Sequence, residues 1–430
     1  MRLSTTGRFP TRIVNCEGVL KSFGAKAVFL PGREVVNDSP SPVIAPKRER
    51  LPSIDILRGF VMAVMALDHV RDYFSLDRGN WMDPTQTRVE LFLTRWFAQL
   101  CAPAFFLLAG LGAYLSLSGG KSKATVARFL ATRGLFLILL DLTLVRIAWD
   151  FNFDYEGGPW FIVLTCLGAS MIVLAGLMFL STFWVVVFSV AIIGGSNLLD
   201  RIPEAQWGRL EPLYTLLHSR SGDELFGIDF YVSYSLLPWV GIMSLGYAIG
   251  PIFRMEPPRR RRCLFLLGFG FLLVFAILRG LRLYGDPRPW STDPDNPLTY
   301  LAFLRTKKYP ASLQHVLMTL GPLLMALALL DRVKTPGMIG RWFVQFGRAP
   351  LFFYLLHLYV LHALVVLIGS VQGFPPQELF VLYSGLPDGF GFRLPGVFVI
   401  WLVVLAICFP LCKWFDRLKR RNQSVWLSYF

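Results

Sequence analysis

The chain has 430 residues, of which 54% are hydrophobic and 17% are charged, and its formal net charge is +15. Its mean hydropathy of +0.51 is too high for a soluble globular protein and indicates a polytopic membrane protein. In a membrane protein Lys and Arg collect in cytoplasmic loops and at helix ends, so the positive charge does not imply a nucleic-acid partner, and we expect none.

Residues 1–50 contain no apolar stretch followed by a small-residue cleavage site, as a signal peptide would. They are mixed in composition and end in Lys47-Arg-Glu-Arg50. We interpret them as a flexible, basic cytosolic tail. A transmembrane domain is expected over residues 51–418, and residues 419–430 are expected to form a second cytosolic tail.

Apolar runs of the ~20 residues that a bilayer requires predict about ten transmembrane helices and an all-α, polytopic fold. Their expected ranges are 53–74, 91–117, 125–149, 159–180, 182–199, 229–254, 261–282, 310–331, 345–371 and 394–415.

The charges of the connecting loops predict the orientation of these helices. Basic loops alternate with loops that hold few bases, as the positive-inside rule expects if both termini are cytoplasmic. The loop 283–309 departs from the rule, because it is placed outside although it holds four bases, which three aspartates partly offset. Loops on the outer side also carry Trp and Tyr, which are typical of membrane interfaces and also suit carbohydrate.

The first span carries several ionisable residues. At 100° per residue, the eleven steps from Arg58 to His69 leave both on one face, about 16 Å apart along the axis. Ionisable residues in a span normally face protein or a water-filled cavity, and are functional candidates by default. Asp55 can pair with Arg58 at i,i+3 spacing. His69, next to Asp68, is a candidate general base, although an isolated histidine is more often a structural hydrogen-bonding group.

Further charges lie in later spans. Arg95 falls in the second span, and Arg133, Asp141 and Arg146 fall in the third. Asp141 fits a catalytic role and a register-fixing ion pair equally well. A surplus of arginine suits an anionic ligand, because guanidinium binds phosphate bidentately. That ligand could be acyl-CoA, a lipid phosphate or a transported anion.

The ninth span opens with Arg348 and Pro350, and His357 follows two turns later. His357 could pair with a carboxylate of the first or third span, or pack with one backbone hydrogen bond. No Cys-x-x-Cys or His-rich spacing predicts a metal, and no soluble-enzyme motif such as a nucleophile elbow is present. The six cysteines are interpreted as packing thiols.

Several of these segments together resemble the heparan-α-glucosaminide N-acetyltransferase-like family. The opening helix matches through Ser53-Ile-Asp-Ile-Leu-Arg-Gly59 with Asp68-His69, and the ninth span through Gly347-Arg-Ala-Pro-Leu-Phe-Phe-Tyr-Leu-Leu-His357. Further matches are Leu93-Thr-Arg-Trp96, Cys101-Ala-Pro-Ala-Phe-Phe-Leu-Leu-Ala-Gly110, Lys308-Tyr-Pro-Ala-Ser312 and Met318-Thr-Leu-Gly-Pro322. The spacing Arg58-x10-His69 is also similar to the motif of membrane acyltransferases that O-acetylate bacterial surface polysaccharides.

The resemblance implies a multi-pass protein of the bacterial inner (plasma) membrane that moves an acyl group, in the first place acetyl, from cytoplasmic acyl-CoA. The acceptor would be a hydroxyl or amine of an extracytoplasmic glycan or lipid-linked sugar. Acyl-CoA would be a donor substrate, with no tightly bound cofactor. Membrane lipids are expected neighbours, and a homodimer is compatible with the sequence.

The chain departs from the lysosomal members of this family at two places. Their histidine before a Trp in the first outer loop is missing from Arg78-Gly-Asn-Trp81, and they carry Asn where this chain has His69. This departure favours His69 as the base of an O-acylating enzyme over amino-sugar acetylation.

The leading hypothesis is therefore an acyltransferase. Its catalytic residues would be His69, steered by Asp68 or Asp141, and its CoA would be bound by Arg58 and other basic groups. The expected substrate-binding residues are Arg58, Asp55, Arg95, Arg133, Arg146, Arg348 and His357. The alternative is a transporter or flippase for an anionic metabolite or lipid-linked sugar, which would use the same cavity without covalent chemistry.

Overall fold

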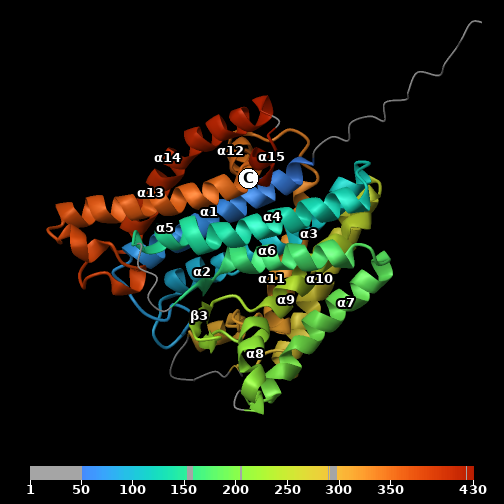
Figure 1. The fold of residues 1–430 in the computed structure, drawn as a ribbon, viewed down its shortest axis with the longest axis horizontal. Helices are drawn as coiled ribbons and strands as arrows, with labels where there is room; N and C mark the ends of the chain where they lie inside the picture. The colour runs from blue at the N-terminus through green and yellow to red at the C-terminus, as the bar shows by residue number, and fades with distance from the viewer. Residues whose placement is uncertain (1–50, 153–157, 204–205, 289, 291–297, 423) are drawn as a thin grey trace, which may run out of the picture. The chain divides into compact units, whose positions relative to one another are not determined.

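The fold is built from helices, as expected, together with one small sheet (Figure 1). The computed structural model describes residues 51–152, 158–203, 206–288, 290, 298–422 and 424–430. The expected N-terminal tail, residues 1–50, lies outside the described residues. The longer helices are α1 (Pro52–Phe74), α2 (Val89–Ala98), α3 (Cys101–Ser118), α4 (Lys123–Leu140), α6 (Val163–Leu177), α7 (Thr182–Gly195), α9 (Leu236–Ala248), α10 (Pro257–Gly280), α11 (Leu313–Leu330), α12 (Met338–Arg348), α13 (Pro350–Val371) and α14 (Leu394–Arg421).

Seven helical segments among the described residues are long and apolar enough to cross a membrane. They are α2 joined to α3, α7 with the turn after it, α9 with the turn after it, α10, α11, α13 and α14. Three more expected spans coincide with helices that do not meet that criterion, because α1 and α4 carry too many charged residues and α6 is too short. The chain is thus a mostly helical, multi-pass membrane protein of the expected all-α class, and the count of ten spans stays a prediction.

Two expected spans have different boundaries in the structure. The segment 345–371 is divided at Ala349, because Pro350 cannot donate a backbone hydrogen bond and begins the new helix α13. The segment expected to start a helix at 229 is instead a strand up to Val232.

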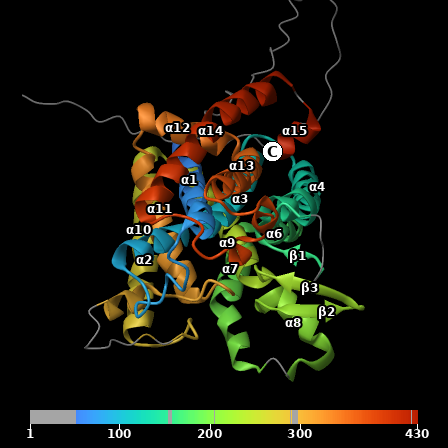
Figure 2. The same ribbon diagram turned by 90° about the vertical axis from the view of Figure 1, so that its left-hand side faces the viewer.

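The sheet has the strand order β1 (Trp160–Phe161), β3 (Ile228–Val232), β2 (Gly222–Leu225). Strands β2 and β3 form a hairpin, which turns through Phe226 and Gly227 with positive φ angles of 55° and 78°. Strand β1 joins from a distant part of the chain and pairs with β3 in parallel. Figure 2 shows the sheet beside the short helix α8 (Glu211–His218).

Helix α1 is central to the helical arrangement. It packs against α2, α3, α11, α12, α13 and α14, and Figure 2 shows it among α11, α13 and α14. Its contact with α12 is very close, because a Cβ atom on Gly59 would lie 1.8 Å from the Phe343 carbonyl oxygen. Being covered on most sides by protein lets α1 carry charged residues that a lipid-facing helix could not.

The end of the chain is helical and does not form a free tail. Helix α14 continues to Arg421, the short helix α15 (Val425–Tyr429) follows, and Phe430 packs against the core. The Tyr429 hydroxyl hydrogen-bonds the Thr132 hydroxyl of α4 at 3.0 Å. Residues 419–430, expected to be a tail, therefore belong to the helical domain.

Helices α3 and α9 cross at two glycines, each of which touches the backbone of the other helix. A Cβ atom on Gly246 would lie 2.0 Å from the Leu107 carbonyl oxygen, and one on Gly110 would lie 1.9 Å from that of Met243. Small residues at such crossings let backbones approach closely in membranes. Side chains cannot be added there without moving the two helices apart.

We predict that Gly246→Ala lowers the thermal unfolding temperature of the purified protein in detergent, because overpacking typically costs about 1–3 kcal/mol. The matched control is Gly270→Ala in α10, where an added Cβ meets nothing within 4 Å. The control should be neutral or slightly stabilising, since alanine favours helix over glycine. Equal melting temperatures for both variants would contradict the close crossing.

Candidate functional site

A cavity of about 860 Å³ runs along α1 and is lined at both ends by charged side chains. We call the end that carries Arg58, Arg133, Arg348 and Lys419 the inner end, and the end that carries His69 the outer end. As the spacing predicts, Arg58 and His69 line the same cavity, eleven residues apart on one helix. Its walls also include parts of α2, α3, α4, α6, α13 and the sheet.

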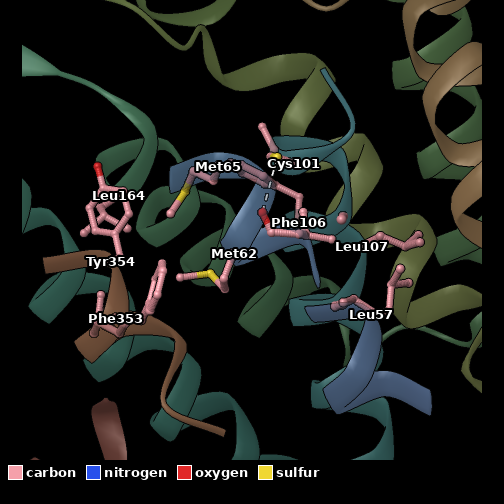
Figure 3. Close-up of a cluster of buried hydrophobic side chains, with 14 of the residues drawn as sticks. Leu57, Met62, Met65, Cys101, Phe106, Leu107, Leu164, Phe353 and Tyr354 are labelled. Carbon is pink, nitrogen blue, oxygen red and sulfur yellow. Dashed lines mark hydrogen bonds between the residues drawn. The ribbon is translucent and has the colours of Figure 1, made fainter. Parts of the chain in front are cut away.

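The middle of the cavity is mostly apolar. Met62, Met65, Leu164 and Tyr354 line it. Figure 3 shows the two methionine side chains of α1 directed toward Tyr354 and the buried Phe353 of α13. Thioether side chains adapt to irregular shapes. Such a passage suits a slender chain that connects a charged group at the inner end to a reactive group at the outer end.

His69 is held by a second histidine. Its Nδ1 lies 2.9 Å from Nε2 of His357 on α13, and the two rings are stacked with centroids 5.2 Å apart. The other ring nitrogen of His357, Nδ1, lies 2.9 Å from the Phe353 carbonyl oxygen. A carbonyl can only accept, so His357 donates from Nδ1 and, when neutral, accepts at Nε2.

This chain of hydrogen bonds fixes the tautomer of His69. Because Nε2 of a neutral His357 accepts, the proton between the two rings belongs to Nδ1 of His69. Nε2 of His69 therefore carries a lone pair, and the imidazole lines the cavity. This arrangement prepares His69 to accept a proton from a molecule in the cavity.

His357 itself is buried and is not part of the cavity wall among the described residues. Its observed contacts are those of a residue that positions His69, and its expected role in substrate binding stays a prediction. Of the two alternatives for His357, the backbone hydrogen bond is present. His357 also pairs with a side chain of the first span, but that side chain is His69 and not a carboxylate.

Asp68 pairs with arginines. It accepts two hydrogen bonds of 2.7 Å from Nη1 of Arg95 and a further one from Arg71, which also lies 3.3 Å from Asp72. Two carboxylates thus face two guanidinium groups on adjoining helices. In the described part of the chain Asp68 makes no hydrogen bond to His69, which pairs with His357 instead, and the steering of His69 by Asp68 stays a prediction.

Asp141 caps a helix. It lies at the start of the π-helical turn η1 (Asp141–Val145), between α4 and α5 (Arg146–Asp150), and is buried. Its Oδ2 accepts a 2.7 Å hydrogen bond from the backbone N–H of Thr165 in the first turn of α6. A carboxylate there satisfies a free N–H group and the positive end of the helix dipole. Asp141 is not among the residues that line the cavity and forms no ion pair with a described arginine, so its observed role is helix capping, and a catalytic role stays a prediction.

The inner end of the cavity gathers three of the predicted arginines. Arg58 donates to the Gly347 carbonyl oxygen at 3.1 Å and lies 3.5 Å from Asp55. Arg348 approaches Asp55 and Asp416 only to 4.0 and 3.8 Å. Asp55 does not line the cavity and acts through these arginines.

Arg133 completes this inner cluster and has no ion-pair partner among the described carboxylates. Its Nε is buried without a hydrogen bond in the described structure. A guanidinium group inside a membrane domain gains most from an anion. Arg133 is thus the predicted residue whose surroundings most favour a bound phosphate.

Arg146 is directed elsewhere. It is buried, it hydrogen-bonds Asp150, and its guanidinium lies 3.8 Å from the centre of the Trp160 ring. Trp160 lines the cavity, but Arg146 does not. In the structure Arg146 thus supports an aromatic wall residue, and its expected contact with substrate stays a prediction.

The outer end includes residues that sequence reasoning missed, above all Lys308, Tyr309, Arg220 and Tyr383. The Tyr309 hydroxyl donates to the Tyr234 hydroxyl at 3.1 Å. Burial raises the pKa of the Tyr234 hydroxyl well above its ordinary value. Burial also acts to raise the pKa of Tyr309, but the charges of Lys308 and Arg95 outweigh it and lower that pKa. The surplus of bases in the loop 283–309 was the available signal.

No cluster of three or more His, Cys, Asp or Glu side chains in the described ranges has the arrangement of a metal site. The wall of the cavity presents histidine, tyrosine and cationic side chains. It combines a proton acceptor at one end with an anion-binding cluster at the other.

The family model described as heparan-α-glucosaminide N-acetyltransferase, catalytic, matches residues 50–282 of this chain. This segment covers more than half of the sequence and includes Arg58, His69, Arg95 and Arg133. The family resemblance found in the sequence is confirmed. No curated protein matches the chain.

The helix-capping role of Asp141 predicts that Asp141→Ala destabilises the protein by about 0.5–2 kcal/mol, as loss of an N-cap does. Asp141→Asn keeps an acceptor for the Thr165 N–H and should be less damaging. Thermal unfolding in detergent measures both effects. If Asp141→Asn folds normally but loses acyl transfer as completely as a substitution of His69, Asp141 is catalytic after all.

Proposed function

The chain belongs to the heparan-α-glucosaminide N-acetyltransferase catalytic family, and we propose that it transfers an acetyl group from cytoplasmic acetyl-CoA across the membrane. The acceptor is a hydroxyl or amine of an extracytoplasmic glycan or lipid-linked sugar. The observation that carries this proposal is the hydrogen-bond chain that leaves Nε2 of His69 unprotonated in the wall of the cavity.

In the reaction, the acceptor group attacks the thioester carbonyl carbon while His69 Nε2 takes its proton. The bond between carbonyl carbon and sulfur then breaks, and the CoA thiolate is protonated by the imidazolium. The pair of His357 and the Phe353 carbonyl supports the positive charge that develops on His69. Such general-base assistance is typically worth ~10²–10⁴-fold in rate.

The inner cluster supports the placement of the donor. Arg58, Arg133 and Arg348 offer guanidinium groups to the phosphates of CoA, because phosphate is bound bidentately by arginine. The apolar middle of the cavity then holds the pantetheine arm. An extended arm matches the distance of about 16 Å along α1 from Arg58 to His69.

We place the inner end on the cytoplasmic side of a bacterial plasma membrane. The N-terminal end of α1, the start of α4 and the end of α14 all carry basic residues, which favour the cytoplasm. Free CoA released only when an acceptor is supplied distinguishes this proposal from a transporter, which would move its substrate without cleaving a thioester.

We predict that His69→Ala lowers acetyl transfer by ~10²–10⁴-fold, because the acceptor proton loses its base. Purified protein would be assayed with acetyl-CoA and an envelope glycan fraction, with release of CoA as the readout. Thermal unfolding and acetyl-CoA binding should stay close to those of the unsubstituted protein. A variant that turns over at the original rate would remove His69 from the mechanism.

A second prediction concerns donor binding. Arg133→Gln should raise the KM for acetyl-CoA about 10- to 100-fold with little change in kcat, because hydrogen bonds to charged groups are worth about 1.5–3 kcal/mol. Arg128→Gln is the matched control, since Arg128 lies on the same helix but is exposed and outside the cavity. The same KM in both variants would argue against phosphate binding at the inner end.

A further inference from the structure

A second cavity, which we call the outer chamber, continues the main cavity beyond His69. Its volume is about 690 Å³, and it shares the wall residues Asp72, Arg95, Arg220, Lys308, Tyr309 and Tyr383 with the main cavity. A molecule that reaches His69 from the outer side therefore passes these side chains.

The wall of the outer chamber is strongly basic. Its described cations are Arg78, Arg95, Arg220, Arg288 and Lys308, against a single carboxylate, Asp72. That carboxylate already faces Arg71 at 3.3 Å and Arg95 at 3.7 Å. Arg95 is in turn neutralised by Asp68. The remaining positive charge of the chamber is not balanced by Asp72.

Neighbouring cations in the same loop do have acidic partners. Lys307 lies 3.1 Å from Asp200, and Arg305 lies 3.3 Å from Asp83. Lys308, the next residue after Lys307, forms no ion pair with any described carboxylate and rests instead on the Tyr309 ring, 5.0 Å from its centre. Of these three loop cations, Arg305 and Lys307 thus have carboxylate partners, whereas Lys308, which lines the chamber, has no ion pair among the described carboxylates.

Arg220 approaches the same ring from the sheet side. Its guanidinium lies 4.5 Å from the centre of Tyr309, and its Nε donates to the Tyr231 hydroxyl at 3.2 Å. Cation–π contacts hold a cation in place without cancelling its charge. Lys308 and Arg220 are thus two oriented positive charges that share one aromatic support.

We propose that the outer chamber binds a phosphate group of the acceptor, through Lys308 and Arg220, so that the acceptor is a phosphate-linked sugar. Two cations match the charge of about −1.5 to −2 that a phosphate monoester such as glucose 1-phosphate carries at neutral pH, and they also attract the single negative charge of a phosphodiester such as a lipid-linked sugar phosphate. This inference rests on the proposed function only in calling the ligand an acceptor. The binding site itself can be tested without acetyl transfer.

The experiment measures equilibrium binding to the purified full-length protein without acetyl-CoA, by calorimetry. The probes are glucose 1-phosphate, its farnesyl ester, glucuronate and glucose. Glucose 1-phosphate should bind at least about tenfold more tightly than glucose, as expected when a charged hydrogen bond is gained. Tighter binding of the farnesyl ester assigns a lipid-linked sugar, and equal binding assigns a soluble sugar phosphate.

Lys308→Gln should reduce the affinity for glucose 1-phosphate toward that for glucose, and Lys308→Arg should retain it. Arg220→Gln should have the same effect as Lys308→Gln. The control Arg209→Gln, at an exposed arginine outside both cavities, should bind as the unsubstituted protein does.

The proposal is overturned if glucose 1-phosphate and glucose bind with equal affinity, or if neither binds. It is also overturned if glucuronate binds more tightly than glucose 1-phosphate, or if the preference for glucose 1-phosphate over glucose survives both Lys308→Gln and Arg220→Gln. If the protein prefers glucose 1-phosphate but never releases CoA, the phosphate site in the outer chamber is supported and the proposed acetyltransferase function is overturned. If CoA is released only with neutral sugars, the acetyltransferase function is supported and the phosphate site is overturned.

Discussion

The hydrogen-bond chain from the Phe353 carbonyl through His357 to His69 is the interaction on which the functional account depends. Both links measure 2.9 Å, and the two histidines lie on α1 and α13, which contact each other. Because a carbonyl oxygen only accepts, the direction of the whole chain is set by the backbone of α13. The result is a lone pair on Nε2 of His69, whose ring lines the cavity, and no described carboxylate forms a hydrogen bond to that ring.

The distribution of charge around α1 follows one pattern. At the level of Asp68, carboxylates and guanidinium groups neutralise each other across α1 and α2, which lowers the cost of burying them. At the two ends of the cavity, Arg133 and Lys308 face the open volume without a described carboxylate partner. Neutralised charges hold the helices in register, and unpaired cations mark where anions are expected to bind.

Much of this arrangement could be predicted from the sequence, because helical periodicity is local. The shared face of Arg58 and His69 follows from 3.6 residues per turn, and the membrane spans follow from runs of apolar residues. Arg133 and Arg348 were expected to bind substrate, and the structure brings both to the cavity.

Partners across helices could not be predicted in this way. From the sequence, Asp68 and Asp141 were expected to lie beside His69. In the structure Asp68 pairs with two arginines, and Asp141 accepts a hydrogen bond at the start of α6. The partner of His69 is His357, which is 288 residues away in the sequence. The small sheet was missed because β3 is short and directly precedes an apolar helix, so its residues were joined to the span that begins at Leu236. Lys308 and Arg220 lie in loops, where the spacing of residues in the sequence does not predict which way a side chain points.

The most direct test of the account is a density map of the protein with a non-hydrolysable acetyl-CoA analogue. The account predicts nucleotide phosphates beside Arg133 and Arg348, and an acyl carbonyl carbon within about 6 Å of Nε2 of His69. That distance leaves room for one acceptor oxygen, about 3 Å from the nitrogen and about 3 Å from the carbon. An acyl group that stops short in the apolar middle of the cavity, or a nucleotide bound at the outer end, would contradict it.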